Sequence, residues 1–288
     1  LIYFGVGCVG VRRAANVKSP CGWHIPKMIK IQLIECVQAA FAAIKSSLHP
    51  TDDKMAALFS SKTERKMQKV IAIDGPSASG KGTVAARVAA ELGWAYLDSG
   101  ALYRLTALFA QRQHIDWNDE AAVAQCAGCL PVVFDGGRIL LDGEDVAQAI
   151  RTESVGMGAS AIAALPKVRA ALLQRQRDFL TEQGLVADGR DMGSVVFPQA
   201  ACKIFLTASA QIRAERRAKQ IGIACEGVAF ERILSDIMAR DEADRRRSVA
   251  PLQQLPDAHL LDTSHRTIDE AVRQVLDWYR EDCAVSCK

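Results

Sequence analysis

A glycine-rich stretch at residues 75–83, GPSASGKGT, carries the residue types that bind phosphate. Glycines let backbone N–H groups approach an anion closely, because no Cβ stands in the way. Lys81 adds a cation that can reach the outer phosphates of a nucleotide, and the Thr83 hydroxyl suits Mg²⁺ or its water shell. We therefore expect a loop that binds the phosphates of ATP through Gly75, Pro76, Ser77, Ala78, Ser79, Gly80, Lys81, Gly82 and Thr83.

Two acidic strings follow short apolar runs: DSG comes after residues 94–97, and DGRD begins at the end of residues 185–188. Ligands of open parallel sheets bind beyond the carboxyl ends of the strands. We therefore expect one crevice to gather Asp98, Ser99, Arg104, Asp188, Arg190 and Asp191. Asp188, at the tip of its strand, is the expected Mg²⁺ ligand, through water. The alternative is an Arg–Asp surface pair, which contributes little.

The last group of candidate residues lies in two segments that are rich in arginine. Residues 211–222 carry Arg213, Arg216 and Arg217, and residues 230–248 carry Arg240, Asp244 and Arg247. Arginines interleaved with acids are typical of a phosphate clamp that moves when it is empty. A solvated helix face or a nucleic-acid patch is the alternative, but the interleaved Asp and Glu argue against nucleic acid.

The elements that must position these groups alternate between strands and helices. Five apolar runs predict strands at 70–73, 94–97, 185–188, 203–206 and 258–262. A helix that ends at Gly93 follows the glycine loop, and Thr267 with Glu270 forms a capping box before the last helix. This order predicts an α/β fold with a five-stranded parallel sheet flanked by helices.

The stretch from residue 114 to about residue 179 does not follow the alternation of strands and helices. The runs 131–134 and 138–141, joined through DGG, predict a β-hairpin, which does not belong in a parallel sheet. We interpret it as an inserted lobe at about 114–179 that also carries Ser160 and Arg169. The core then comprises residues 69–113 and 180–281, with a short Arg-rich lid at about 213–247 and a tail at 282–288.

The first 68 residues differ from the rest in charge. They hold 10 Lys/Arg against 4 Asp/Glu, whereas the remaining 220 residues hold 26 against 29. The body therefore has no overall basic field for nucleic acid, and no window of 18 apolar residues suggests a membrane span. Residues 28–48 have helical apolar spacing. We expect this extension to be either a docking appendage or the result of a wrong start, with Met67 or Met55 as the true first residue.

Cysteine and histidine give weaker signals. The nine cysteines are odd in number and scattered, which is typical of reduced thiols in a cytoplasmic protein. Cys126 and Cys129 have CxxC spacing, but no second pair accompanies them, so a metal or redox role is not favoured. We expect His259 and His265 to be structural or exposed.

Five strings in order resemble the bacterial cytidylate kinases, a branch of the nucleoside monophosphate kinase family of P-loop proteins: GPSASGKGT, DSGALYR, IRTESVGMGASAIAALPKVR, DGRDMGSVVFP and RDEADRRRSVAPL. The resemblance covers residues 69–281. Gly82 between Lys81 and Thr83 matches this family, and not the common form in which Ser or Thr directly follows the lysine. Ala78-Ser79 departs from the Gly-Ala that the family often has.

The resemblance implies transfer of the ATP γ-phosphoryl group to CMP or dCMP, with Mg²⁺, in a cytoplasmic monomer that binds neither nucleic acid nor a membrane. It implies that Arg104, Arg190 and Arg247 hold the CMP phosphate and that Ser99, Ser160, Arg169 and Asp191 read the cytosine. Arg240 and Asp244 would hold the sugar, and Arg213 and Arg217 would close over ATP. The implied catalytic groups are Lys81, Arg190, Arg247, Arg213 and Arg217.

Two other readings of the motifs stay open from the residues alone. One is a kinase for a different small acceptor, such as adenylate, uridylate or shikimate; the adenylate enzymes lack the hairpin lobe. The other is a nucleotide-binding regulator or RNA-associated NTPase, which would hydrolyse ATP without an acceptor or bind RNA in a salt-sensitive way.

Overall fold

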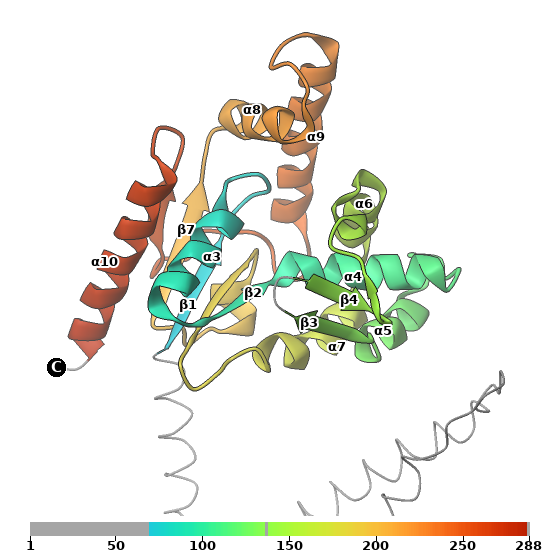
Figure 1. Cartoon of the computed structure of the whole chain (residues 1–288), viewed down its shortest axis with the longest axis horizontal. Helices are drawn as coiled ribbons and strands as arrows, with labels where there is room; N and C mark the ends of the chain where they lie inside the picture. The colour runs from blue at the N-terminus through green and yellow to red at the C-terminus, as the bar shows by residue number, and fades with distance from the viewer. Residues whose placement is uncertain (1–68, 136–137, 287–288) are drawn as a thin grey trace, which may run out of the picture. The chain divides into compact units, whose positions relative to one another are not determined.

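The computed structural model describes residues 69–135 and 138–286; the predicted helix at 28–48 and the expected start at Met67 or Met55 lie outside this part. Five parallel strands form one sheet in the order β2-β6-β1-β7-β8 (Figure 1). The prediction of a five-stranded parallel sheet is thus confirmed. The strands are β1 (Val70–Asp74), β2 (Ala95–Asp98), β6 (Leu185–Gly189), β7 (Cys202–Thr207) and β8 (His259–Asp262).

The central strand β1 is buried on both faces of the sheet. It pairs with β6 from Val70↔Leu185 to Asp74↔Gly189, and β7 lies on its other side. Because side chains alternate along a strand, Val70 and Ala72 join one core cluster while Ile71 and Ile73 join the other. This explains why β1 reads as a continuous apolar run.

Helices cover each face of the sheet. Helix α3 (Lys81–Leu92) and helix α10 (Ile268–Ser286) supply apolar side chains to the cluster around Ile71 and Ile73. Helix α4 (Ser99–Arg112) supplies the opposite cluster. Gly93 ends α3 in a left-handed conformation, as predicted, and α10 begins with the predicted capping box of Thr267 and Glu270. Helix α10 continues past the predicted end near Arg280, so residues 282–286 are helical and not a tail.

The predicted antiparallel hairpin lies apart from the main sheet. Strands β3 (Val132–Asp135) and β4 (Arg138–Leu141) pair in antiparallel register, and a short strand β5 (Glu144–Asp145), which the sequence did not reveal, extends them. The surrounding helices are α5 (Glu120–Gly128), α6 (Glu153–Ile162) and α7 (Pro166–Arg177), with a 3₁₀ turn at Ala149–Arg151. Their apolar side chains continue the core cluster that α4 begins.

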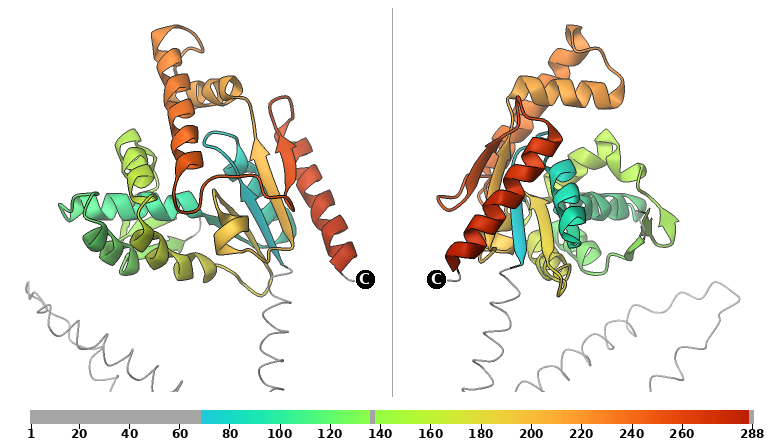
Figure 2. Two further views of the ribbon diagram at one scale, coloured as in Figure 1. Left: turned by 180° about the vertical axis from the view of Figure 1, so that it is seen from behind. Right: turned by 60° about the vertical axis from the view of Figure 1, so that its left-hand side comes forward.

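Two helices stand beyond the carboxyl ends of the strands (Figures 1 and 2). Helix α8 (Ala210–Ile221) follows β7, and helix α9 (Gly227–Arg246) packs against it around Phe230 and Ile237. These helices contain the predicted lid segment. They thus lie at the same edge of the sheet as the glycine loop.

Among the described helices, none is by itself both long and apolar enough to cross a membrane. The pair α6 and α7 meets that length and composition test only when the two are taken together, and it is bent by 101°.

Candidate active site

The glycine loop connects β1 to α3 in a conformation that needs glycine at two points. A Cβ at Gly75 would lie 2.0 Å from the backbone oxygen of Leu206 on β7, so the loop could not pass this strand with a larger residue. Gly80 has a φ of +91°, which is costly for residues with a Cβ. Helix α3 then begins at Lys81, and its first N–H groups and the positive end of its dipole face the loop. The arrangement is that of an anion-binding loop.

Lys81 lies inside this loop. Its Nζ donates a hydrogen bond to the Pro76 oxygen at 3.3 Å. Burial and the nearby Arg190 lower the pKa of Lys81 to about 8, although Asp188 and Asp98 favour its charged form. A phosphate bound in the loop would add negative charge beside Lys81 and so favour the charged form of its amino group.

Asp188, near the end of β6, is a buried carboxylate beside Lys81. Burial, followed by the charge of Asp98, raises its pKa to about 7, against the opposing effect of Lys81. Its Oδ1 finds no hydrogen-bond partner among the described residues. A Cβ on Gly82 would lie 3.2 Å from Asp188 Oδ2, so the carboxylate faces the start of α3 next to Thr83. An unsatisfied buried carboxylate oxygen in a cavity that the Thr83 side chain also lines is a donor set that suits a hard divalent cation.

A carboxylate on α9 links two predicted arginines at this edge. Arg190 Nε donates to Asp244 Oδ2 at 2.7 Å, and Arg247 Nη2 donates to Asp244 Oδ1. Asp244 is 6% exposed. The contact fixes the end of α9 against the DGRD string of β6, and each guanidinium retains further N–H donors for an anion.

A second ion pair lies deeper between α7 and the end of β6. Arg169 Nη2 donates to Asp191 Oδ2, and Arg169 Nη1 donates to the Ala163 oxygen at 3.1 Å. The Arg169 guanidinium also lies 6.0 Å from the Tyr103 ring centre. Both partners are almost fully buried, at 8% and 5% exposed. A paired donor and acceptor held this rigidly could read the polar edge of a base.

Two neighbouring cavities, of about 350 and about 770 Å³, open at this edge of the sheet. The smaller one is lined by the predicted residues Lys81, Ser99, Ser160, Arg169, Asp188, Arg190, Asp191, Asp244 and Arg247. The larger one extends toward β3 and β4, where Phe134 and Ile139 contribute apolar surface. Both cavities are lined by Ser77, Ala78, Gly82, Thr83, Asp98, Arg104 and Arg240. The structure therefore brings together the two acidic strings, the glycine loop and the end of α9.

Comparison with known proteins identifies this arrangement. The family model for cytidylate kinase matches residues 71–281. The chain belongs to the cytidylate kinase family. A curated cytidylate kinase of Neisseria meningitidis serogroup B is 77% identical over 214 residues, which are 74% of this chain and 98% of that protein. Those of Neisseria gonorrhoeae (75% over 214 residues; 74% and 98%) and Chromobacterium violaceum (61% over 212 residues; 74% and 96%) are also similar.

The arginines of α8 lie in different environments. Arg213 is buried, donates to both carboxylate oxygens of Asp241 and contacts the Ser77 oxygen at 3.2 Å. Arg217 lines the larger cavity and donates to Gln220. The structure thus leaves Arg217 facing the cavity, while Arg213 joins the lid to the loop.

Arg216 and Asp74 also contact the site, although the family resemblance implied a role for neither of them. Arg216 Nη1 donates to the Ser79 oxygen at 2.9 Å and to Thr263 Oγ1 at 3.1 Å. Asp74 accepts 2.8 Å bonds from the backbone N–H groups of Met192 and Gly193. The available signal for Arg216 was its spacing of three residues from Arg213, which places both side chains near one face of the helix. No local signal marked Asp74, which reads as the last residue of a strand.

Asp74 should give the stability of this protein a distinct pH dependence. Burial raises the pKa of Asp74 from 3.8 to about 6, while the two backbone N–H donors oppose this shift. The native carboxyl then holds its proton where the unfolded chain has lost it, so the free energy of unfolding falls as pH rises from about 4 to about 6. Asp74→Asn does not titrate. Across that range the wild type should lose about 3 kcal/mol relative to the variant in urea unfolding; a constant difference would contradict the argument.

Proposed function

We propose that this chain transfers the γ-phosphoryl group of ATP to CMP or dCMP, giving ADP and CDP or dCDP, in pyrimidine nucleotide metabolism. One observation carries the proposal beyond family membership. The two cavities have the glycine loop, Arg104 and Arg240 in common. A donor phosphate and an acceptor phosphate bound from the two sides would therefore meet beside Lys81.

The chemistry asks for cations and positioning more than for a nucleophile. The acceptor phosphate is already anionic, so transfer in line needs two anions to be held together and their charge neutralised. We assign Lys81 to the outer phosphates of ATP, and Arg104, Arg190 and Arg247 to the CMP phosphate. Arg213 and Arg217 would bring α8 over ATP, and Arg217 has the cavity position to contact it.

The polar groups of the smaller cavity fit a pyrimidine nucleoside. Ser99 and Ser160, with the buried pair Arg169–Asp191, offer both donors and acceptors to the edge of cytosine. Arg240 and Asp244 would hold the sugar and accept ribose or deoxyribose. Asp98 lies at the start of α4, where its carboxylate caps the helix through Ala101 N at 3.0 Å and lines both cavities.

The residues present also fit a Mg²⁺ ion. Oxygen ligands and retained waters are what this cation prefers, and the unsatisfied Oδ1 of buried Asp188 with the Thr83 hydroxyl meets that preference. When bound, the cation would supply charge neutralisation for the phosphates of ATP. Thr83 would contact the ion or its water shell, and Asp188 would hold it through water.

Closure of α8 and α9 would exclude water and so limit hydrolysis of ATP without an acceptor. We assign the catalytic domain to residues 69–281, with the acceptor lobe at 114–179 and the lid at 213–247. Its mildly acidic charge balance supports small-molecule substrates and no nucleic-acid partner. A cytoplasmic monomer that needs no membrane completes the proposal.

The test is ADP production from ATP and Mg²⁺ by purified protein offered CMP, dCMP, UMP, AMP or shikimate in parallel. Turnover with CMP and dCMP well above that with the others supports both the reaction and the proposed base-reading groups. Turnover with AMP or UMP instead keeps phosphoryl transfer and overturns the roles of Ser160, Arg169 and Asp191. ATP hydrolysis that no acceptor accelerates overturns the proposal.

A further inference from the structure

A second cluster of ligand-type side chains lies at the opposite edge of the sheet, where the strands begin. Cys202 is the first residue of β7, and His259 is the first residue of β8. His259 pairs with Ile204, two residues beyond Cys202, so all three side chains share one face of the sheet. Helix α10 covers that face and contributes Asp282. Three elements distant in sequence thus bring one thiol, one imidazole and one carboxylate together.

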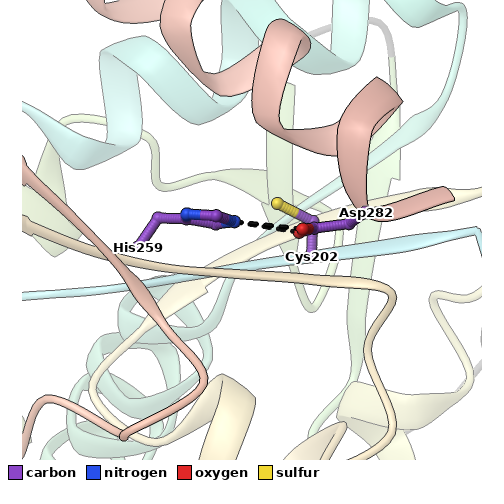
Figure 3. A group of neighbouring side chains, drawn as sticks. All are labelled: Cys202, His259 and Asp282. Carbon is purple, nitrogen blue, oxygen red and sulfur yellow. Dashed lines mark hydrogen bonds and ion pairs between the residues drawn. The ribbon is translucent and has the colours of Figure 1, made fainter. Parts of the chain in front are cut away.

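The three side chains point toward one another (Figure 3). His259 Nε2 lies 3.1 Å from each carboxylate oxygen of Asp282. One sulfur, one nitrogen and one oxygen from these residues all lie within 4.8 Å of one another. Cys202 is 1% exposed, whereas the other two side chains are about 30% exposed, so an ion could reach the cluster from solvent.

The ring of His259 is held in place by stacking on an aromatic ring. It stacks on Trp278 of α10, with ring centres 4.7 Å apart and planes 6° apart. Trp278 and Asp282 are four residues apart on α10, which places both on the helix face that meets the strand. The orientation of the imidazole toward Asp282 is therefore built into the packing.

We propose that Cys202, His259 and Asp282 form a binding site for a divalent transition metal of the zinc class, separate from the nucleotide site. Zinc takes thiolate, imidazole and carboxylate ligands in tetrahedral geometry, and its N and O ligands at about 2.0–2.1 Å would lie about 3.3 Å apart. The observed distance of 3.1 Å between His259 Nε2 and the Asp282 carboxylate oxygen is close to this expected distance between two ligand atoms. A sulfur and a nitrogen ligand disfavour Mg²⁺, which prefers oxygen. Water would supply the fourth ligand.

Binding would follow a simple proton balance. The Cys202 thiol loses its proton to solvent and binds as thiolate. His259 binds through Nε2 with its ring proton on Nδ1, and Asp282 binds as carboxylate. The metal replaces the hydrogen bonds between His259 and Asp282 and ties α10 to β7 and β8.

The position of the cluster determines what the metal would do. The glycine loop follows the carboxyl end of β1, whereas Cys202 and His259 begin the parallel strands β7 and β8. Binding there should stabilise the fold without changing phosphoryl transfer. A saturating ion raises the melting temperature because it binds the native state. At a hundredfold excess over its Kd, we expect a rise of about 5 to 10 °C.

Cobalt titration of the chelator-treated full chain tests the proposal, because Co²⁺ bound to thiolate shows a charge-transfer band in the near ultraviolet. We expect one equivalent of Co²⁺ to give this band in the wild type and Zn²⁺ to displace it. Cys202→Ser should lose the band, while Cys225→Ser, which removes an exposed thiol on another part of the surface, should keep it. Cys283→Ser should also keep the band, because the proposed ligand is Cys202. This variant is included because Cys283 is the neighbouring thiol that could otherwise account for the band.

Two further variants keep the test decisive if Cys202→Ser does not fold. His259→Phe preserves stacking on Trp278 and Asp282→Asn preserves shape; each should weaken Co²⁺ binding by about tenfold or more. Each should also lose most of the Zn²⁺-dependent rise in melting temperature while retaining wild-type kinase activity with Mg²⁺. A band that persists in Cys202→Ser, or a Zn²⁺ effect unchanged in both other variants, would overturn the site. A wild type without the band would show that the cluster is only a hydrogen-bonded His–Asp pair beside a buried thiol.

Discussion

Replacing Lys81 with alanine is expected to lower kcat for CMP phosphorylation by about 10²- to 10³-fold, the usual cost of losing one group that stabilises transition-state charge. The Lys81 amino group lies inside the loop and contacts only the Pro76 oxygen among the hydrogen bonds of the described residues. Its pKa is lowered mainly by burial, so the native fold gains little from this charge in the absence of phosphate. The variant should therefore stay folded, and steady-state ADP production with thermal melting checks both halves.

A matched control is Lys69→Ala, which removes an exposed lysine just before the same strand. Lys69 Nζ donates to the Glu182 backbone oxygen at 3.0 Å, on the side of β1 away from the loop. It should keep wild-type kcat and KM for ATP. Full activity in Lys81→Ala would show that the Lys81 side chain has no role in phosphoryl transfer. Equal losses in both variants would indicate a general effect of removing a lysine.

The sheet of this protein could be predicted because its signals are local. Continuous apolar runs, Gly93 after α3 and the Thr267–Glu270 box each act within a few residues, and each appears in the structure as expected. Boundaries were less accurate where packing, and not local pattern, decides them. Helix α10 continues to Ser286, past Tyr279, which is the last of its apolar residues in the core cluster; in this last part Asp282 contacts His259 of β8.

The site was predictable where residue type and strand end coincide. The string DGRD begins in the last two residues of β6, so parallel pairing with β1 placed it beside the glycine loop. The partners of its charged groups could not be read in the same way. Asp244 lies 54 residues from Arg190, and Asp241 lies 28 residues from Arg213. Nothing local distinguishes these acids from the other Asp and Glu residues of α9.

The cluster of Cys202, His259 and Asp282 shows the same limit more sharply. In the sequence His259 is a lone histidine, and Cys202 is one of nine scattered cysteines. Only the parallel register of β7 with β8 and the packing of α10 bring the three together. Non-local pairings of this kind depend on the topology, which a pattern of single residues does not contain.

The second large effect is expected from Asp191→Ala, which leaves the Arg169 guanidinium buried without its carboxylate. Removing one partner of a buried ion pair typically lowers the free energy of unfolding by about 3–5 kcal/mol. The same change takes an acceptor from the proposed cytosine site, so kcat/KM for CMP should fall about 100-fold. The Kd for ATP should change little, because the Asp191 carboxylate pairs with Arg169 of α7, in the proposed acceptor lobe, and not with the glycine loop.

A double variant separates the two effects. Arg169→Met with Asp191→Leu removes both charges, and replacing a buried pair by apolar residues is often neutral or stabilising. We expect it to recover most of the lost unfolding free energy in urea while CMP phosphorylation stays low. If the double variant also regains CMP turnover, the loss in Asp191→Ala came from unfolding and not from recognition. If Asp191→Ala weakens ATP binding as much as CMP use, the pair does not read the base, because one carboxylate at that depth would then be supporting the whole cleft.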